Sequence, residues 1–160
     1  MTSQQIVQLD LLALSLFACF SAYFLITDIR FHRLPNRAML VAALSGGVVA
    51  IAASLEHADI FLITQYLVRA LTYGLVMLAV WLLSNHSLGA GDVKLTAVIG
   101  GYSAFVPASA AHTFIPISIA VISLVVVVVA IVCKQNRFAY GPVLLAGFWS
   151  GAWLSTRDWL

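Results

Sequence analysis

The sequence predicts an all-α, polytopic membrane protein with about six transmembrane helices. Hydrophobic residues make up 62% of the 160-residue chain and charged residues 9%, against roughly 45–50% and about 25% in soluble domains. Several apolar runs approach or reach the ~20 residues that a helix needs to cross a bilayer. The sequence has no segments of alternating polar and apolar residues, the mark of a membrane barrel, so helices are the spanning structure that remains.

The expected spans follow one another in this order: about 8–27, 38–55, 65–83, 93–108, 114–133 and 141–156. The first break falls at Pro35, because proline lacks an amide hydrogen and forces the residue before it into extended geometry. The fourth and sixth stretches are short for a straight crossing, which is tolerated where a polar end is buried in protein. Gly147 and Gly151, four residues apart, predict a close helix–helix contact. Without a linker or a repeat, residues 1–160 are expected to form one membrane-embedded domain.

Basic residues predict the orientation of this bundle. With the N-terminus outside, six of the eight Lys and Arg residues fall in inner loops, as the positive-inside rule requires: Arg30, Arg33, Arg37, Lys94, Lys134 and Arg137. Arg69 and Arg157 fall outside, and the inverted orientation would place six cations on the wrong face. No Lys or Arg precedes the first stretch, so we expect it to be a retained span and not a removable signal peptide.

Two aspartates, Asp28 and Asp92, are the only acidic residues on the predicted inner side. The other acids fall on the outer side: Asp10, Glu56, Asp59 and Asp158. Two carboxyls brought together at a polar–apolar boundary do not both ionise easily, and they share one proton. The ionised partner can take a proton from water while the protonated partner polarises a peptide carbonyl. The pair therefore predicts aspartyl protease chemistry.

Asp92 closes a glycine-containing segment, Gly89-Ala90-Gly91-Asp92. We expect the two glycines to form a tight turn with positive φ, a conformation that other side chains disfavour. Such a turn would bring the main chain close to whatever the carboxyl acts on. Lys94 lies two positions further on and is a candidate to bind substrate or to tune the aspartate pair.

Simpler interpretations of these residues stay open from the sequence alone. Asp92 is also expected as an N-terminal cap of the fourth helix, where the helix dipole favours an anion. Asp28, next to Arg30 and Arg33, is also expected as a solvated partner of basic residues. Lys94 also serves as a topology signal.

Neither a metal nor a cofactor is expected. The histidines lack helical ligand spacing and are divided between the two sides, with His32 and His86 inside and His57 and His112 outside. The two cysteines, Cys19 and Cys133, lie in apolar stretches and are too few for a metal site. The hydroxyl residues near Asp92 have no recognisable His–acid pair beside them, so serine catalysis is not expected either.

The motifs resemble those of the type IV prepilin peptidases. These membrane enzymes carry one catalytic aspartate after the first span, followed by a basic turn that ends in Pro-Asn, and Asp28–Asn36 (DIRFHRLPN) matches that pattern. The second family aspartate lies in a Gly-x-Gly-Asp motif followed by x-Lys, which Gly89–Lys94 (GAGDVK) reproduces. Ala139–Pro142, ahead of an apolar run that ends in Gly147, resembles the final segment. The resemblance covers about residues 20–151.

The resemblance implies a bacterial inner-membrane aspartic endopeptidase that needs no metal or cofactor. Its catalytic residues would be Asp28 and Asp92, with Gly89, Gly91 and Lys94 in the active-site loop. The implied substrate is a prepilin whose short basic leader is cut at the cytosolic membrane face, typically after a glycine. Larger members N-methylate the new terminus through an added N-terminal region with paired cysteines. The chain starts at its first span, so we expect cleavage alone, as in tight-adherence (Flp) pilus systems. Archaeal preflagellin peptidases have similar chemistry.

A small proton-coupled transporter or a membrane scaffold subunit is the alternative. Intramembrane carboxyls suit proton relays, but transporter sites usually lie near the bilayer midplane and no acid is predicted there. The partners expected for a peptidase are the prepilin, the pilus-assembly machinery and membrane lipids. Arg30, Arg33 and Arg37 would repel a basic leader and are expected to contact lipid headgroups. A net charge of +2 is too small to suggest a nucleic acid.

Overall fold

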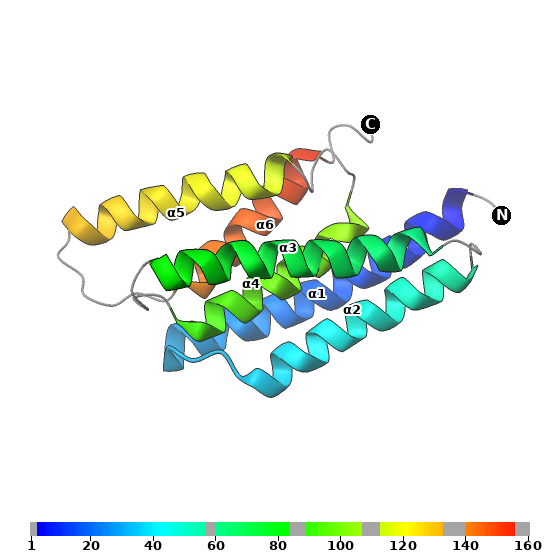
Figure 1. Cartoon of the computed structure of the whole chain (residues 1–160), viewed down its shortest axis with the longest axis horizontal. Helices are drawn as coiled ribbons and strands as arrows, with labels where there is room; N and C mark the ends of the chain where they lie inside the picture. The colour runs from blue at the N-terminus through cyan, green and yellow to red at the C-terminus, as the bar shows by residue number, and fades with distance from the viewer. Residues whose placement is uncertain (1–2, 57–59, 84–88, 107–112, 133–139, 156–160) are drawn as a thin grey trace.

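The computed structural model describes residues 3–56, 60–83, 89–106, 113–132 and 140–155 (Figure 1). Within these ranges six α-helices follow one another: α1 (Ser3–Phe31), α2 (Asn36–Glu56), α3 (Phe61–Leu83), α4 (Ala90–Tyr102), α5 (Ile115–Val132) and α6 (Gly141–Ser155). A short 3-10 helix, η1 (Ser103–Phe105), continues from α4. Each α-helix overlaps one of the predicted stretches, so the all-α fold class is confirmed.

Three helices of the described part are long and apolar enough to cross a membrane: Gln8–Phe31 within α1, then α2 and α3. The described part of α5 contributes a shorter apolar stretch, Ile115–Val125. With 13 and 15 residues, α4 and α6 fall below the ~20 residues of a straight crossing. Three of the about six predicted crossings are thus met by length and composition, and the short fourth and sixth helices were expected.

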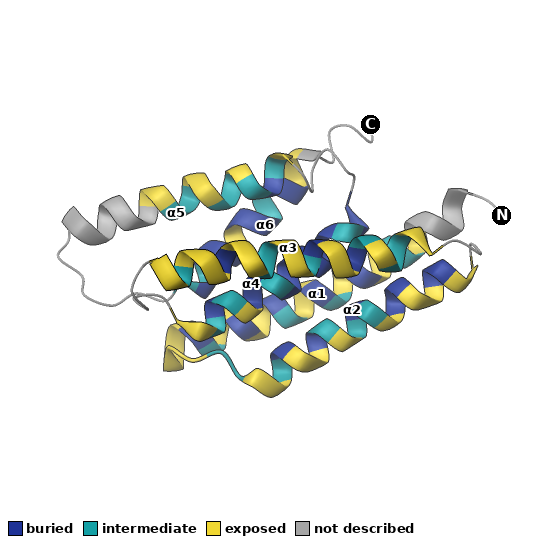
Figure 2. Ribbon diagram, viewed as in Figure 1, coloured by how far each residue is buried: buried dark blue, intermediate teal, exposed yellow. Residues whose placement is uncertain are grey.

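Large apolar side chains cover the outside of the bundle. Figure 2 shows exposed residues along the outer faces of α2 and α3, and among them Leu44 is 59% and Leu71 64% exposed. Such extensive apolar exposure is not tolerated by a protein that is surrounded by water. With the three long apolar helices, it identifies a membrane protein.

Helix α4 lies in the middle of the bundle, in contact with α1, α2, α3 and α6. At its C-terminal end the Tyr102 hydroxyl donates a hydrogen bond to the backbone oxygen of Ala42 (3.0 Å). The ring of Phe17 on α1 stacks on Tyr102 with 4.4 Å between the centroids, and Phe148 on α6 meets Phe17 edge-on at 4.9 Å. This aromatic core fixes α4, and with it Asp92 in its first turn, relative to α1 and α6.

Glycines allow two helix pairs to approach closely. A Cβ atom at Gly100 of α4 would lie 2.5 Å from the backbone oxygen of Arg69 on α3. A Cβ at Gly147 would lie 2.5 Å from Cγ1 of Ile119, and one at Gly151 would lie 2.6 Å from Cα of Ile115. The predicted close contact at Gly147 and Gly151 is confirmed, and it seats α5 on α6.

The charged groups of the described part divide between the two ends of α4. Arg69 is buried, and its Nη1 donates to the backbone oxygen of Ser103 (2.6 Å), just beyond the end of α4 that is remote from Asp92. The basic residues of the α1–α2 connection and Lys94 belong to the Asp92 end, as predicted. Five other charged positions of that prediction lie outside the described residues: Asp59, Lys134, Arg137, Arg157 and Asp158.

Candidate active site

Asp28 lies in the last turn of α1, and its side chain is buried, with 6% exposed. Its Oδ2 accepts a hydrogen bond from the backbone N–H of Gly141 (2.9 Å), the first residue of α6. The helix ends at His32, which adopts a φ of 50° and donates its N–H to the Asp28 backbone oxygen (2.9 Å). The interpretation of Asp28 as a solvated partner of Arg30 and Arg33 is wrong, because the carboxyl is buried and accepts a hydrogen bond from the first residue of a helix.

Asp92 lies in the first turn of α4 and is 7% exposed. Its Oδ2 accepts the N–H of Gly89 (3.1 Å), while its own N–H donates to the Gly89 oxygen (3.0 Å). Gly89 and not Asp92 is therefore the N-cap of α4, and Asp92, the third residue of the helix, closes its start by bonding back to that cap. The same bonds hold the carboxyl in one orientation, which a reacting group also needs.

The fold brings the two carboxyls to the same end of the bundle. Asp28, at the end of α1, lies beside the first residue of α6, and Asp92 lies in the first turn of α4. Burial raises the pKa of Asp92 to about 6, and the negative charge of Asp28 adds to this rise, while the Gly89 N–H lowers the pKa. Electrostatic coupling of this kind requires that the two groups be near each other. The pair therefore holds a proton at pH values where isolated aspartates are fully ionised.

The raised pKa of Asp92 predicts how the stability of the protein depends on pH. Its value in the folded protein exceeds the ordinary 3.8 of an unfolded chain, so the free energy of unfolding falls as the pH rises from about 4 to about 6. Above that pH the free energy of unfolding is lower than at acidic pH by a total of the order of 3 kcal/mol. Asp92→Asn removes the ionisation, so the variant should melt several degrees above the wild type at pH 7.5 and level with it at pH 4.

Thermal melts of the detergent-purified proteins test this, with Glu56→Gln as the control on an exposed acid. The control should show no such pH-dependent difference. An Asp92→Asn variant that melts below the wild type at pH 7.5 would contradict the argument.

The loop glycines act by close approach and not by left-handed backbone. Gly89 has a φ of −74°, and none of the described glycines has a positive φ, so the predicted turn conformation is wrong. A Cβ at Gly91 would lie 3.3 Å from Cβ of Leu34, in the connection between α1 and α2. A Cβ at Gly89 would lie 3.1 Å from the Oδ2 of Asp92 itself. Small residues are needed here because the start of α4 is packed against its neighbours.

Gly91→Ala should therefore weaken activity more than stability. Leu34 must move by a few tenths of an ångström to admit the methyl group, and this displaces the turn that carries Asp92. We expect a loss of activity of about tenfold, since small errors in position are costly for a reacting group, and a nearly unchanged melting temperature in detergent. Equal losses of activity and stability would refute this account of Gly91.

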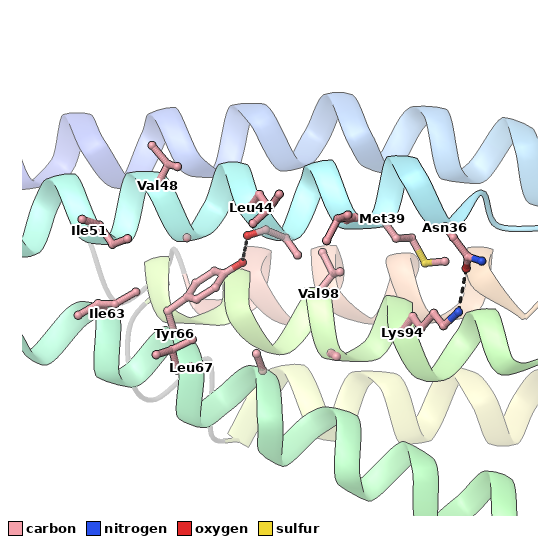
Figure 3. Close-up of a pocket in the computed structure, with 15 residues that line it drawn as sticks. Asn36, Met39, Leu44, Val48, Ile51, Ile63, Tyr66, Leu67, Lys94 and Val98 are labelled. Carbon is pink, nitrogen blue, oxygen red and sulfur yellow. Dashed lines mark hydrogen bonds between the residues drawn. The ribbon is translucent and has the colours of Figure 1, made fainter.

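Lys94 forms a hydrogen bond with the Pro35-Asn36 segment and not with the aspartates. Its Nζ donates to Oδ1 of Asn36 (2.8 Å), the first residue of α2, as Figure 3 shows. Residues two apart on a helix face different directions, so Lys94 lies off the face that carries Asp92. The bond joins the Pro35-Asn36 segment to the first turn of α4 across 58 positions of sequence. Its role in binding substrate stays a prediction.

Gly141 belongs to the site, although it was not predicted as a site residue. A Cβ at Gly141 would lie 2.6 Å from the Oδ2 of Asp28, so no larger residue admits the carboxyl there. The signal in the sequence was Gly141-Pro142, since proline suits the first turn of a helix whose N-terminus attracts an anion. Nothing in the sequence indicated that Asp28 is the anion.

Within the described residues, no group of three or more His, Cys, Asp or Glu side chains is placed to hold a metal ion. Several residues weighed in the sequence lie outside the described part: His57, His86, His112 and Cys133. In the described part of the chain the candidate site contains two buried carboxyls, each of which accepts a hydrogen bond from a backbone N–H.

One family model matches the chain, that of the type IV leader peptidase family, over residues 15–133. The matched stretch contains both aspartates, the Gly89–Gly91 loop and Lys94, and it ends before Gly141. Comparisons with curated proteins and with solved structures found no match. The family match spans most of the chain, and it joins the two motifs that the fold brings to one end of the bundle. The chain belongs to the type IV leader peptidase family.

Proposed function

We propose that this protein is a membrane aspartyl endopeptidase that removes the leader from a type IV, Flp-like prepilin at the cytosolic membrane face. In this proposal all six helices form one domain in a bacterial inner membrane, with the N-terminus outside. The short helices α4 and α6 start at the buried aspartate end and complete their crossings within the protein. Methyl transfer to the new terminus is not part of the proposal.

The observation that carries the proposal is the pairing of two buried carboxyls from distant parts of the chain. Asp28 and Asp92 are 64 positions apart, yet both are buried at one end of the bundle, where burial raises the pKa of Asp92 and the charge of Asp28 adds to this rise. Aspartate side chains are almost never buried unless they are paired, yet both of these are buried. Here each accepts a backbone N–H at a helix start, and the pair keeps a proton that it can transfer.

The geometry supports a division of labour within the pair. Burial disfavours charge on both carboxyls. The Gly141 N–H and the positive end of the α6 dipole offset this in part at Asp28, and once Asp28 is charged, its charge favours the proton on Asp92. The Asp28 carboxylate takes a proton from water, and the hydroxide attacks the peptide carbonyl, whose oxygen accepts a hydrogen bond from Asp92. Asp28 then gives its proton to the leaving nitrogen, and the peptide bond breaks.

The position of the pair fits a substrate whose cut lies beside an apolar helix. The aspartates lie where α1 ends and α4 begins, next to the basic connection between α1 and α2. A leader peptide would reach them from the water phase while the apolar segment stays in the bilayer. A proton-coupled transporter is not favoured, because both carboxyls lie at one end of the helices and not in the middle of a span.

Co-expression with a candidate prepilin tests the proposal. The prepilin should lose the mass of its leader when the wild-type protein is present and keep it when the protein is absent. A prepilin whose residue before the cut is changed should stay uncut and serves as the control. A protein that moves a solute into vesicles and leaves every tested prepilin intact would overturn the proposal.

A further inference from the structure

A second feature of the fold is a cavity of about 500 Å³ between α3 and α5, with α4 and α6 at its back. This volume is within the ~300–1,000 Å³ of ordinary ligand sites. Most of its lining is apolar, and hydroxyl groups stand among the apolar side chains, including those of Thr96, Ser123 and Tyr140. We call it the α3–α5 cavity.

Two residues of its lining connect the α3–α5 cavity to the aspartates, although neither aspartate lines it. Thr96 follows Asp92 by about one turn on the same face of α4, and its hydroxyl donates to the Asp92 backbone oxygen (2.7 Å). Tyr140, on another wall, directly precedes Gly141, whose N–H holds Asp28. A molecule that fills the cavity would therefore contact a residue bonded to Asp92 and the residue that precedes the hydrogen-bond partner of Asp28.

The cavity also faces the membrane. In the described part of the chain α5 packs mainly on α6, and α3 packs mainly on α4 and α2. Figure 1 shows α5 lying over α6, with α3 over α4. The two helices that flank the opening are thus held to the bundle by other partners, and an apolar segment can enter between them from the side.

A larger groove, of about 800 Å³, runs between α2 and α3 (Figure 3), but it lies on the wrong side of α4. It touches α4 through Lys94, Ala97 and Val98, which are roughly 200°, 140° and 240° around the helix from Asp92. The Tyr66 hydroxyl in this groove donates to the backbone oxygen of Ala43 (2.6 Å), and Lys94 is bonded to Asn36. We call it the α2–α3 groove.

We infer that the α3–α5 cavity receives the apolar segment of the substrate that follows the cleaved bond, and that this segment enters sideways from the membrane. The inference rests on the proposed function and names the path to the site. A helix must open around the bond that is cut, and the freed backbone groups need partners at membrane depth. The cavity supplies them, because a hydroxyl that already donates, such as that of Thr96, still accepts from a substrate N–H.

Cysteine cross-linking from matched positions tests the path. Val76 of α3 lines the α3–α5 cavity and Leu44 of α2 lines the α2–α3 groove. They are 61% and 59% exposed, and each lies about 11 Å along its helix from the aspartate end. Val76→Cys and Leu44→Cys are made in an Asp92→Asn protein whose native cysteines, Cys19 and Cys133, are replaced by alanine. The prepilin carries single cysteines through the first ten or so residues after the cut.

If the apolar segment occupies the α3–α5 cavity, we expect the prepilin cysteines to form a disulfide with Val76→Cys and none with Leu44→Cys. In the active enzyme Val76→Trp should reduce processing about tenfold or more, mainly through KM, while Leu44→Trp stays within about twofold. Cross-links at Leu44→Cys, at both positions or at neither would overturn the path, provided that the wild-type protein cuts the same prepilin. If the wild type does not cut it, the proposed function fails instead.

Discussion

Replacing either aspartate of the pair by asparagine is expected to abolish leader removal. Asparagine keeps the size of the side chain and can accept the Gly141 or Gly89 N–H, so the fold should persist. It can neither take a proton from water nor give one to the leaving nitrogen. We expect the rate of processing by Asp28→Asn and by Asp92→Asn to fall by about 10²–10⁴-fold or more, measured on purified enzyme and prepilin in detergent.

Asp10→Asn is the matched control, because it makes the same chemical change on the same helix, α1, at the opposite end. It should process prepilin at the wild-type rate. The membrane content and melting temperature of all three variants show whether the fold is kept. Substantial processing by Asp92→Asn would end the assignment of the pair as the catalytic groups.

Gly141→Ala is expected to be nearly as damaging, although it adds only a methyl group. The new Cβ would lie 2.6 Å from the Oδ2 of Asp28, far inside van der Waals contact. Either α6 or the carboxyl must move, and in both cases the bond from the Gly141 N–H is lost or lengthened. Because a displacement of about 1 Å can cost about 100-fold in rate, we expect a loss of that order in kcat.

Gly47→Ala provides the comparison, since a Cβ at Gly47 meets only the Tyr66 ring, at an ordinary 3.8 Å. It should leave kcat unchanged. A Gly141→Ala enzyme with the wild-type kcat would show that the contact between α6 and Asp28 does not position the carboxyl for reaction.

Local sequence was sufficient to predict the helices and the end at which the aspartates meet. Apolar runs broken at Pro35 and at the Gly89–Gly91 segment carry enough information, because a spanning helix satisfies its own backbone hydrogen bonds. Asp28 and Asp92 both follow odd-numbered spans, so counting crossings places them on one side. The tight packing at Gly147 and Gly151 also followed from their spacing.

Contacts between segments that are distant in the sequence could not be predicted from local sequence patterns. The bond from Gly141 to Asp28 joins residues 113 positions apart, and it turns an apparently solvated acid into a buried one. The loop glycines were assigned the wrong property, since their need for small size arises from Leu34 and from Asp92 itself. Lys94 likewise finds Asn36 only once α2 and α4 are packed.

The proposed mechanism requires that Asp28 and Asp92 titrate as a coupled pair. Infrared titration of the carboxyl stretch, in wild type and in Asp28→Asn, measures this directly. We expect the pKa of Asp92 to be about 6 in the wild type and to fall in Asp28→Asn while staying above 3.8, because burial persists after the neighbouring charge is removed. An Asp92 pKa that is the same in both proteins would mean that the two carboxyls act independently, and it would contradict the paired mechanism.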